Sequence, residues 1–161
     1  MKKLYLVSND KIWLSKKKYT SNNDLDSIIS CLNKKYSIRL LNRKSKKKLK
    51  FKVKNKFNFY NLKNIYEKKI NLLMISISPY NFLILLKLIY LKKINVKGFV
   101  YLRSDGFLEY KIRYGLLGYY IYYFMFKLIS NKLKILSCSN NFTHVKVKNL
   151  LHPSELSFEW F

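Results

Sequence analysis

Gly98-Phe-Val-Tyr-Leu-Arg-Ser-Asp-Gly-Phe-Leu-Glu-Tyr-Lys-Ile-Arg113 contains a short apolar strand, a polar tip and the first turns of an amphipathic helix. This succession is typical of an open α/β sheet, in which ligands bind in the crevice beyond the carboxyl ends of the strands. Arg103, Ser104, Asp105 and Gly106 fall at that point. Asp105 is also one of only 8 acidic residues in the chain, so its position at a strand end is informative.

Apolar runs and helical spacings alternate along the rest of the chain. Continuous apolar runs predict buried strands at 4–7, 37–41, 72–77, 99–102 and 133–136. Helical spacing predicts helices over 25–32, 82–90 and 107–130, with Ser78 capping the middle helix and Pro79 in its first turn. We expect a polar loop from Ser8 to Asn22. The alternation predicts a single α/β domain over residues 1–161, Rossmann-like with three layers and a mostly parallel sheet.

The last helix is long and unusually apolar. Its second half, residues 116–129, is apolar on all sides apart from Lys127, which is typical of a fully buried helix or of one lying on a membrane. Gly115 and Gly118 permit a kink or close packing. Glu109 and Arg113 have the spacing of an exposed ion pair. One stripe of the helix is expected to face the core: Tyr110, Tyr114, Leu117, Ile121, Phe124 and Leu128.

A lysine-rich segment from Lys46 to Phe57 alternates with period two. Apolar residues lie between the lysines, so the pattern predicts a strand with one cationic face and one apolar face. One interpretation is an edge strand that its lysines protect from aggregation. The other is a surface for anionic lipid or another polyanion. In that second interpretation the membrane-surface residues are Lys46, Lys48, Lys50, Lys52 and Lys54.

The formal charge of +25 would ordinarily indicate a nucleic acid or an anionic surface as the partner. The chain, however, has no Ala and no Gln, and it is rich in Lys, Asn, Ile, Tyr and Phe, the residues of AT-rich codons. Arginine, which supplies the planar forks that read phosphates and bases, occurs only at positions 39, 43, 103 and 113. We therefore attribute most of the charge to codon composition, and nucleic acid is the less favoured partner.

Several kinds of chemistry have no motif in this sequence. The turn after the first strand, Ser8-Asn-Asp-Lys11, contains no glycine, which argues against nicotinamide, flavin or P-loop nucleotide binding there. Cys31 and Cys138 lack metal-ligand spacing and are interpreted as structural thiols in a reducing compartment. We predict no cofactor and no metal. The first apolar run is too short for a signal peptide, so we expect a cytoplasmic protein that can lie on the inner face of the membrane.

Asp105 and Glu109 are the candidate acid–base or hydroxyl-binding groups. A carboxylate can accept hydrogen bonds from sugar hydroxyls or take the proton of an attacking one. Asp105 can equally cap the helix that follows it, and one carboxylate can do both. Glu109 is better explained by its ion pair. Arg103 either binds an anion or braces the loop.

The order of these pieces resembles the N-terminal half of GT-B glycosyltransferases, in particular the compact sugar transferases of AT-rich marine bacteria that build cell-envelope polysaccharides. The resemblance covers residues 70 to 161 well and the earlier part by pattern alone. It is carried by Leu73-Met-Ile-Ser-Ile-Ser-Pro-Tyr80, Val100-Tyr-Leu-Arg-Ser-Asp-Gly106 with Glu109-Tyr-Lys111, Ile135-Leu-Ser-Cys-Ser139, and Pro153-Ser-Glu-Leu156 with Trp160-Phe161.

The resemblance implies a division of labour between two Rossmann-like domains, the N-terminal one holding the acceptor and the C-terminal one the nucleotide sugar. Asp105 would then be catalytic, and Arg103, Ser104, Gly106 and Glu109 would contact a lipid-linked or polysaccharide acceptor. Nothing in the chain matches the donor domain, so we expect a truncated or split gene product that is inactive without a separate donor-binding domain. The alternative is a small basic protein, not an enzyme, that binds nucleic acid or an anionic membrane surface.

Overall fold

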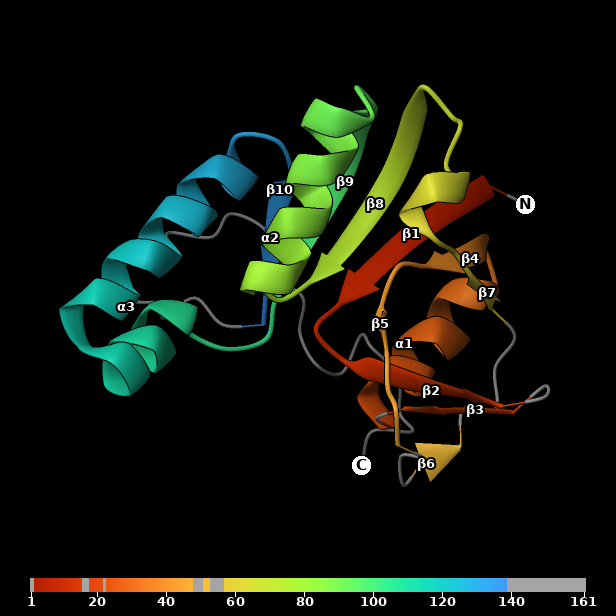
Figure 1. Cartoon of the computed structure of the whole chain (residues 1–161), viewed down its shortest axis with the longest axis horizontal. Helices are drawn as coiled ribbons and strands as arrows, with labels where there is room; N and C mark the ends of the chain where they lie inside the picture. Colours follow the sequence, from red (N-terminus) through yellow and green to blue (C-terminus); the bar gives the residue numbers. More distant parts are fainter. Residues whose placement is uncertain (1, 16–17, 22, 48–50, 53–56, 139–161) are drawn as a thin grey trace.

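The structure is a computed structural model that describes residues 2–15, 18–21, 23–47, 51–52 and 57–138. Its centre is a six-stranded sheet in the order β10-β9-β8-β1-β4-β7 (Figure 1). Every neighbouring pair in this sheet is parallel, which confirms the prediction of an α/β fold with a parallel sheet. The strands are β1 (Lys2–Ser8), β4 (Tyr36–Leu40), β7 (Asn58–Phe59), β8 (Lys69–Ile75), β9 (Asn95–Leu102) and β10 (Lys134–Ser137).

The strand order determines where a ligand can enter. Numbered along the chain, the six parallel strands run 3-2-1-4-5-6 from β7 to β10, which is the order of a doubly wound Rossmann-type sheet. The direction of winding reverses between β1 and β8. In sheets of this kind the crevice for a ligand lies beyond the carboxyl ends of the strands, at that reversal.

Helices cover the two faces of the sheet. The helix α1 (Asn23–Asn33) packs on one face against Leu4 and Leu6 of β1, whereas Tyr5 and Val7 face the opposite core, as the alternation of side chains along a strand requires. That opposite core is formed with the 3-10 turn η1 (Leu62–Asn64), the helix α2 (Pro79–Leu86) with its π-helical continuation η2 (Lys87–Leu91), and the helix α3 (Gly106–Ser130). Ser78 caps α2, accepting from the Asn81 amide, with Pro79 at the helix start, as predicted.

The prediction of a polar loop between Ser8 and Asn22 is wrong. The chain instead forms the antiparallel strands β2 (Lys11–Ser15) and β3 (Lys18–Ser21), with Trp13 opposite Thr20. They belong to a second sheet, β5-β2-β3-β6, completed by the short strands β5 (Arg43–Lys44) and β6 (Phe51–Lys52). The many lysines of this segment made its sequence resemble a polar loop. Ile12 of β2 is nevertheless completely buried.

The long helix α3 is bent. Gly115 has φ 65° and ψ −154°, which interrupts the helix between two straight parts. The prediction of a core-facing stripe through Tyr114 and Leu117 is wrong, because both side chains are exposed. Of the two interpretations of residues 116–129, the fully buried helix is wrong, because Leu116 and Phe124 are exposed; a helix lying on a membrane stays a prediction. The core instead receives Phe107, Gly118, Tyr122, Met125 and Ile129.

Among its described residues, the lysine-rich segment is a strand only at positions 51–52, and not at 46–47 or 57, so the continuous strand that its alternation predicts is wrong. Lys46 is exposed and lies in a bend. Lys52 belongs to the two-residue strand β6, of which the backbone is described. Lys48, Lys50 and Lys54 lie outside the described residues, so the cationic face predicted for them stays a prediction.

Candidate functional site

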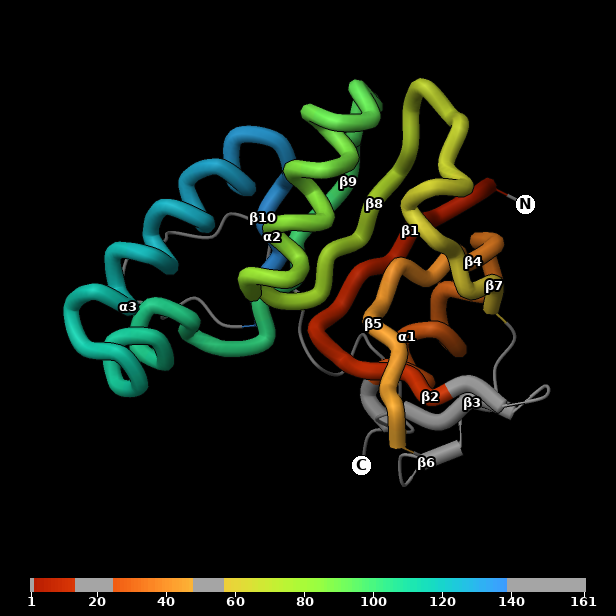
Figure 2. Tube along the Cα trace, viewed as in Figure 1, coloured from red at the N-terminus to blue at the C-terminus, as the bar shows by residue number. Residues whose placement is uncertain are grey.

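The carboxyl ends of four parallel strands bring polar residues to one edge of the sheet. Ser8 ends β1, Ser76 follows β8, Arg103 follows β9, and Asn42 comes two residues after β4. Figure 2 shows the chain passing from β1 to β2 and from β8 to α2 at this edge. The sequence pattern predicted polar residues at the β9 end, and the structure adds the β1 and β8 ends, between which the winding reverses.

The tip after β9 is tied to its neighbours. The Arg103 Nε donates to the Ser76 Oγ at 3.4 Å, which links the end of β9 to the end of β8. The Arg103 carbonyl accepts from the Cys138 thiol at 3.2 Å, which links it to the end of β10. Ser104 is exposed beside these contacts. Arg103 therefore lies one strand away from the reversal point and in contact with it.

Asp105 caps α3. Its Oδ1 accepts from the amides of Phe107 at 3.0 Å and Leu108 at 3.2 Å. These amides belong to the first turn of the helix, where unpaired N–H groups and the helix dipole stabilise a negative charge. The capping role expected of Asp105 is thus present, and the carboxylate is held at a fixed position on the carboxyl edge.

The two other acceptor-binding candidates of this segment have different surroundings. Gly106 is buried against Tyr122, and a Cβ at this position would come within 2.1 Å of the tyrosine Cζ. Glu109 is exposed one turn further along α3. Within the described part of the chain no ion pair joins Glu109 to Arg113, so the explanation of Glu109 as half of an ion pair fails.

Ser76 has an unusual backbone conformation. Its φ is 62°, in the left-handed region that non-glycine residues seldom adopt. The completely buried Asn81 holds this turn, because its Nδ2 donates to the carbonyls of Ile75 at 2.9 Å and Ser76 at 2.8 Å. Residues in such strained conformations concentrate at ligand sites. The turn places the Ser76 hydroxyl next to Arg103.

A second polar cluster closes the end of β1. The Ser8 amide donates to the Asn42 Oδ1 at 3.0 Å, and the Asn42 Nδ2 donates to the Ser8 Oγ at 2.6 Å. The Ser8 hydroxyl donates to the Asp10 Oδ2 at 3.0 Å. Ser8 and Asn42 are both buried. This cluster occupies the position where a dinucleotide-binding protein has its glycine turn, and the chain then enters β2 rather than a helix.

Arg43 is a second cation at this edge, and it is not among the site residues predicted from the sequence. Its Nη2 donates to the Asn9 carbonyl at 3.1 Å, and its guanidinium carbon lies 4.9 Å from the centre of the Tyr80 ring. The Arg43 Nε is buried and has no hydrogen-bond partner among the described residues. Burial raises the pKa of Tyr80, whose hydroxyl donates to the Leu41 carbonyl at 2.8 Å. Arg43 follows a predicted strand and is one of four arginines, a signal that could have identified it.

A charged network joins three side chains on the α2 face of the sheet. Arg39 donates to both Glu67 and the Tyr5 hydroxyl, and that hydroxyl donates to Glu67 at 2.9 Å. Desolvation alone would raise the pKa of Glu67, but hydrogen bonds and the Arg39 charge outweigh it and lower the pKa to about 2. Desolvation is also the main cause that raises the pKa of Tyr5 to about 12. A cavity of about 520 Å³ adjoins this network, lined by Arg39, Phe59, Tyr60, Asn64, Tyr66 and Glu67.

Comparison with known proteins identifies no relative. No protein-family model, curated protein or solved structure matches the chain. The site must therefore be interpreted from its own geometry. Among the described residues no group of His, Cys, Asp and Glu could hold a metal ion, and no helix of that part is long and apolar enough to cross a membrane.

Proposed function

We propose that the protein is the acceptor-binding half of a glycosyltransferase, with the acceptor at the carboxyl edge between β1 and β9. The observation that carries the proposal is the arrangement of Arg103, Asp105 and Ser76 beside the reversal point of the sheet. Sugars are recognised by fixed carboxylates and hydroxyls that exchange hydrogen bonds with their hydroxyl groups. The ordered motifs that resemble GT-B enzymes support the same conclusion.

Each residue has a distinct task in this proposal. Asp105 accepts the proton of the attacking acceptor hydroxyl. In the same step the hydroxyl oxygen bonds to the anomeric carbon of the donor sugar, and the nucleoside diphosphate departs from that carbon. Capping fixes this carboxylate, so little reorganisation is needed at the moment of reaction. Arg103 and Arg43 attract a phosphate or carboxylate on the acceptor. Donor binding and stabilisation of the departing diphosphate belong to a separate domain or chain.

The test is whether the chain itself binds acceptors, and nuclear magnetic resonance of an isotope-labelled sample measures that binding. Methyl glycosides and sugar phosphates serve as probes. We expect amide shifts at residues 103–106 and at Ser76, with sugar phosphates stronger than neutral glycosides. Shifts confined to other regions of the chain would contradict the proposal.

Calorimetry provides a second test. We expect no measurable affinity for nucleotide sugars, because the end of β1 is closed by Ser8 and Asn42 and carries no glycine turn. Tight binding of a nucleotide sugar would mean that the chain serves as the donor half instead.

We also propose that the protein works on the surface of an anionic membrane, where a lipid-linked acceptor is presented. Support comes from α3, which exposes large apolar side chains beside cationic ones. This observation favours a membrane over nucleic acid as the partner, because base edges are read mainly by polar and charged side chains, whereas α3 exposes leucines and an isoleucine around its bend.

A further inference from the structure

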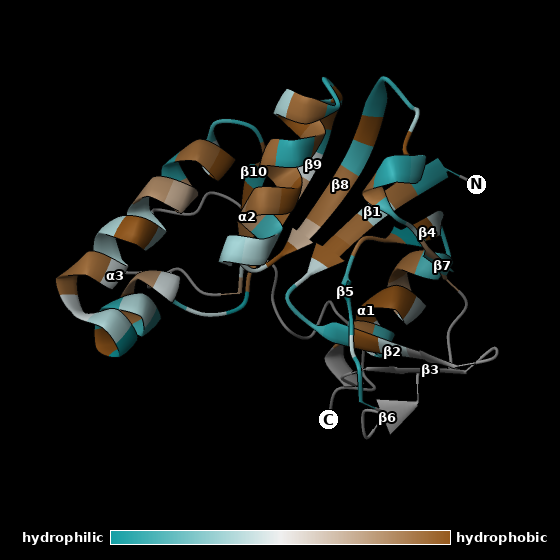
Figure 3. Ribbon diagram, in the orientation of Figure 1, coloured by the Kyte–Doolittle hydropathy of each residue, from teal (hydrophilic) through white to brown (hydrophobic). Residues whose placement is uncertain are grey.

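The bent helix α3 exposes apolar side chains along most of its length. Around the bend, Ile112 is 75% exposed, Leu116 is 66% exposed and Leu117 is 71% exposed. Figure 3 shows hydrophobic residues on outward-facing turns of this helix. Exposed apolar patches larger than a few hundred Å² are rare on soluble monomers and mark interaction surfaces.

The bend makes this surface protrude. Because Gly115 interrupts the helix, the turns around it point away from the core, and Figure 1 shows the bend at the far end of the molecule from β1. Tyr114 and Tyr120, each 63% exposed, flank the leucines. Tyrosine beside leucine is typical of the membrane interface, where the ring is buried and the hydroxyl stays in water.

The apolar surface continues onto α2. A shallow groove of about 460 Å³ separates the two helices, lined by Phe82 and Leu83 of α2 and by Tyr120, Ile121 and Phe124 of α3. The rings of Phe82 and Phe124 meet edge to face across it at 6.2 Å. Such a groove offers hydrocarbon chains an apolar surface that extends from the bend toward the start of α2, which follows the end of β8.

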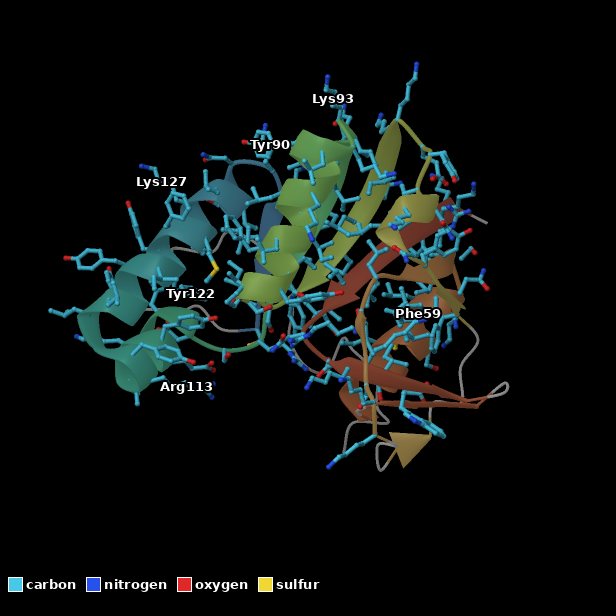
Figure 4. The ribbon with its side chains drawn as sticks, viewed as in Figure 1. Phe59, Tyr90, Lys93, Arg113, Tyr122 and Lys127 are labelled. Atoms are coloured by element: carbon cyan, nitrogen blue, oxygen red, sulfur yellow. The ribbon has the colours of Figure 1, made fainter. Side chains whose placement is uncertain are left out.

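Charges select the occupant of this surface. Arg113 lies next to the bend, and Lys127 lies near the other end of α3 (Figure 4). Lys111 lies half a turn before Arg113, and Glu109 is the one acidic residue of the helix. A second copy of this chain would bring the same cations face to face, and each copy carries +25. Anionic lipid headgroups complement these cations, and acyl chains complement the apolar side chains.

We propose that the bend of α3 and the groove between α2 and α3 insert into the interface of an anionic bilayer. The apolar turns enter the boundary between headgroups and acyl chains, and Lys111 and Arg113 contact the headgroups. The inference rests on the membrane association in the proposed function and specifies which surface provides it. It differs from a docking surface made of Lys46 to Lys54.

The experiment is flotation of the full chain with phosphatidylcholine vesicles, with and without phosphatidylglycerol. The apolar variant is Leu116→Gln/Leu117→Gln, and its control is Tyr66→Gln, an 85% exposed side chain on the loop before β8. The charge variant is Lys111→Gln/Arg113→Gln, and its control, Lys68→Gln/Lys69→Gln, has the same net charge. All of these side chains are exposed, and thermal unfolding verifies that each variant is folded.

We expect phosphatidylglycerol to strengthen binding of the wild-type chain. The Leu116→Gln/Leu117→Gln variant should lower the partition coefficient about tenfold or more, because two leucines no longer enter the bilayer. The charge variant should lose more of the phosphatidylglycerol effect than its control. Tyr66→Gln should float like the wild type.

Three results would overturn the inference. Unchanged flotation of the leucine variant would place the docking surface elsewhere. Equal losses in the charge variant and its control would reduce binding to nonspecific attraction by a cationic chain. The third result is that the chain does not bind vesicles and forms a dimer in sedimentation equilibrium that the Leu116→Gln/Leu117→Gln variant does not form. A second copy of the chain, not a membrane, would then cover the apolar surface of α3. The vesicles contain no sugar donor or acceptor, so failure here is distinct from failure of the transfer reaction.

Discussion

Asp105 has two roles that one pair of substitutions can separate. Its Oδ1 accepts two amide hydrogen bonds at 3.0 and 3.2 Å at the start of α3. Asparagine retains a side-chain oxygen and caps helices about as well as aspartate, whereas alanine leaves the amides without this acceptor. Asp105→Ala should therefore lower the free energy of unfolding by about 1 kcal/mol for the cap, and by up to about 1 kcal/mol more for the charge lost at the helix dipole.

Asp105→Asn should lose the charge contribution alone, less than about 1 kcal/mol. Urea unfolding followed by circular dichroism measures both changes, and equal slopes in urea would show that the two unfolded states are comparable. In acceptor titrations of the folded variants, Asp105→Asn should weaken the sugar-dependent amide shifts, because an amide offers one acceptor oxygen and an NH2 donor where the carboxylate offers two acceptor oxygens.

Two results would refute this reasoning. If both variants are destabilised equally, the Oδ1 cap does not account for the stability. If Asp105→Asn binds acceptor sugars like the wild type, and transfers sugar at the wild-type rate when paired with a donor domain, Asp105 is a helix cap and has no catalytic role.

Three further predictions concern stability. Glu67 has a folded-state pKa lowered to about 2, so its ionised form contributes fully to the free energy of unfolding above the unfolded pKa near 4.3. That contribution is lost as the pH falls toward 2. Glu67→Gln should therefore flatten the acid end of a stability–pH curve measured by urea unfolding. Gly115→Ala should cost about 1–3 kcal/mol in denaturant titration through backbone strain alone, because nothing lies within 4 Å of the added Cβ and φ is 65°; an unchanged midpoint would show that the bend is dispensable. Met125→Ala should cost about 2–5 kcal/mol, whereas Leu117→Ala at a 71% exposed position should change stability by less than about 0.5 kcal/mol in the same assay; the reverse order would restore the core stripe that the structure rejects.

The sequence predicted the parallel sheet because that information is local. A buried parallel strand is a continuous apolar run. Most side chains of Leu72 to Ile75 and all of Val100 to Leu102 are buried, so polar residues there would be removed from water. The tip after β9 followed from the same pattern, since the residue after a strand must lie at its carboxyl end. The capping by Asp105 was likewise visible as an acidic residue just before a helix.

The orientation of α3 could not be predicted from its pattern. Apolar residues occupy nearly every position of its second half, so several stripes fit the sequence equally well. A stripe drawn through Tyr114 and Leu117 also assumes an unbroken helical period, and Gly115 shifts the phase between the two parts. The side that is buried was decided by contact with α2 and the sheet, which no local pattern contains.

The network of Tyr5, Arg39 and Glu67 was missed for a related reason. Its members come from β1, β4 and the loop before β8, and they meet because those elements are neighbours in space. Arg43 and Tyr80 also meet across the sheet edge. Such pairs depend on strand order, and the order β7-β4-β1-β8 follows from tertiary packing rather than from spacing along the chain.

The position of β1 at the centre of the sheet has a consequence for how the chain folds. One edge of β1 pairs with β4, which follows soon after α1. The other edge pairs with β8, which comes much later in the chain; Tyr5, for example, lies opposite Leu72. Closure of a long loop must precede that pairing, and such nonlocal contacts slow folding. As the chain leaves the ribosome, β1 and β4 can associate while the other edge of β1 has its hydrogen-bonding groups exposed. Until β8 is synthesised and docks, this nascent half-sheet is open to pairing with another chain.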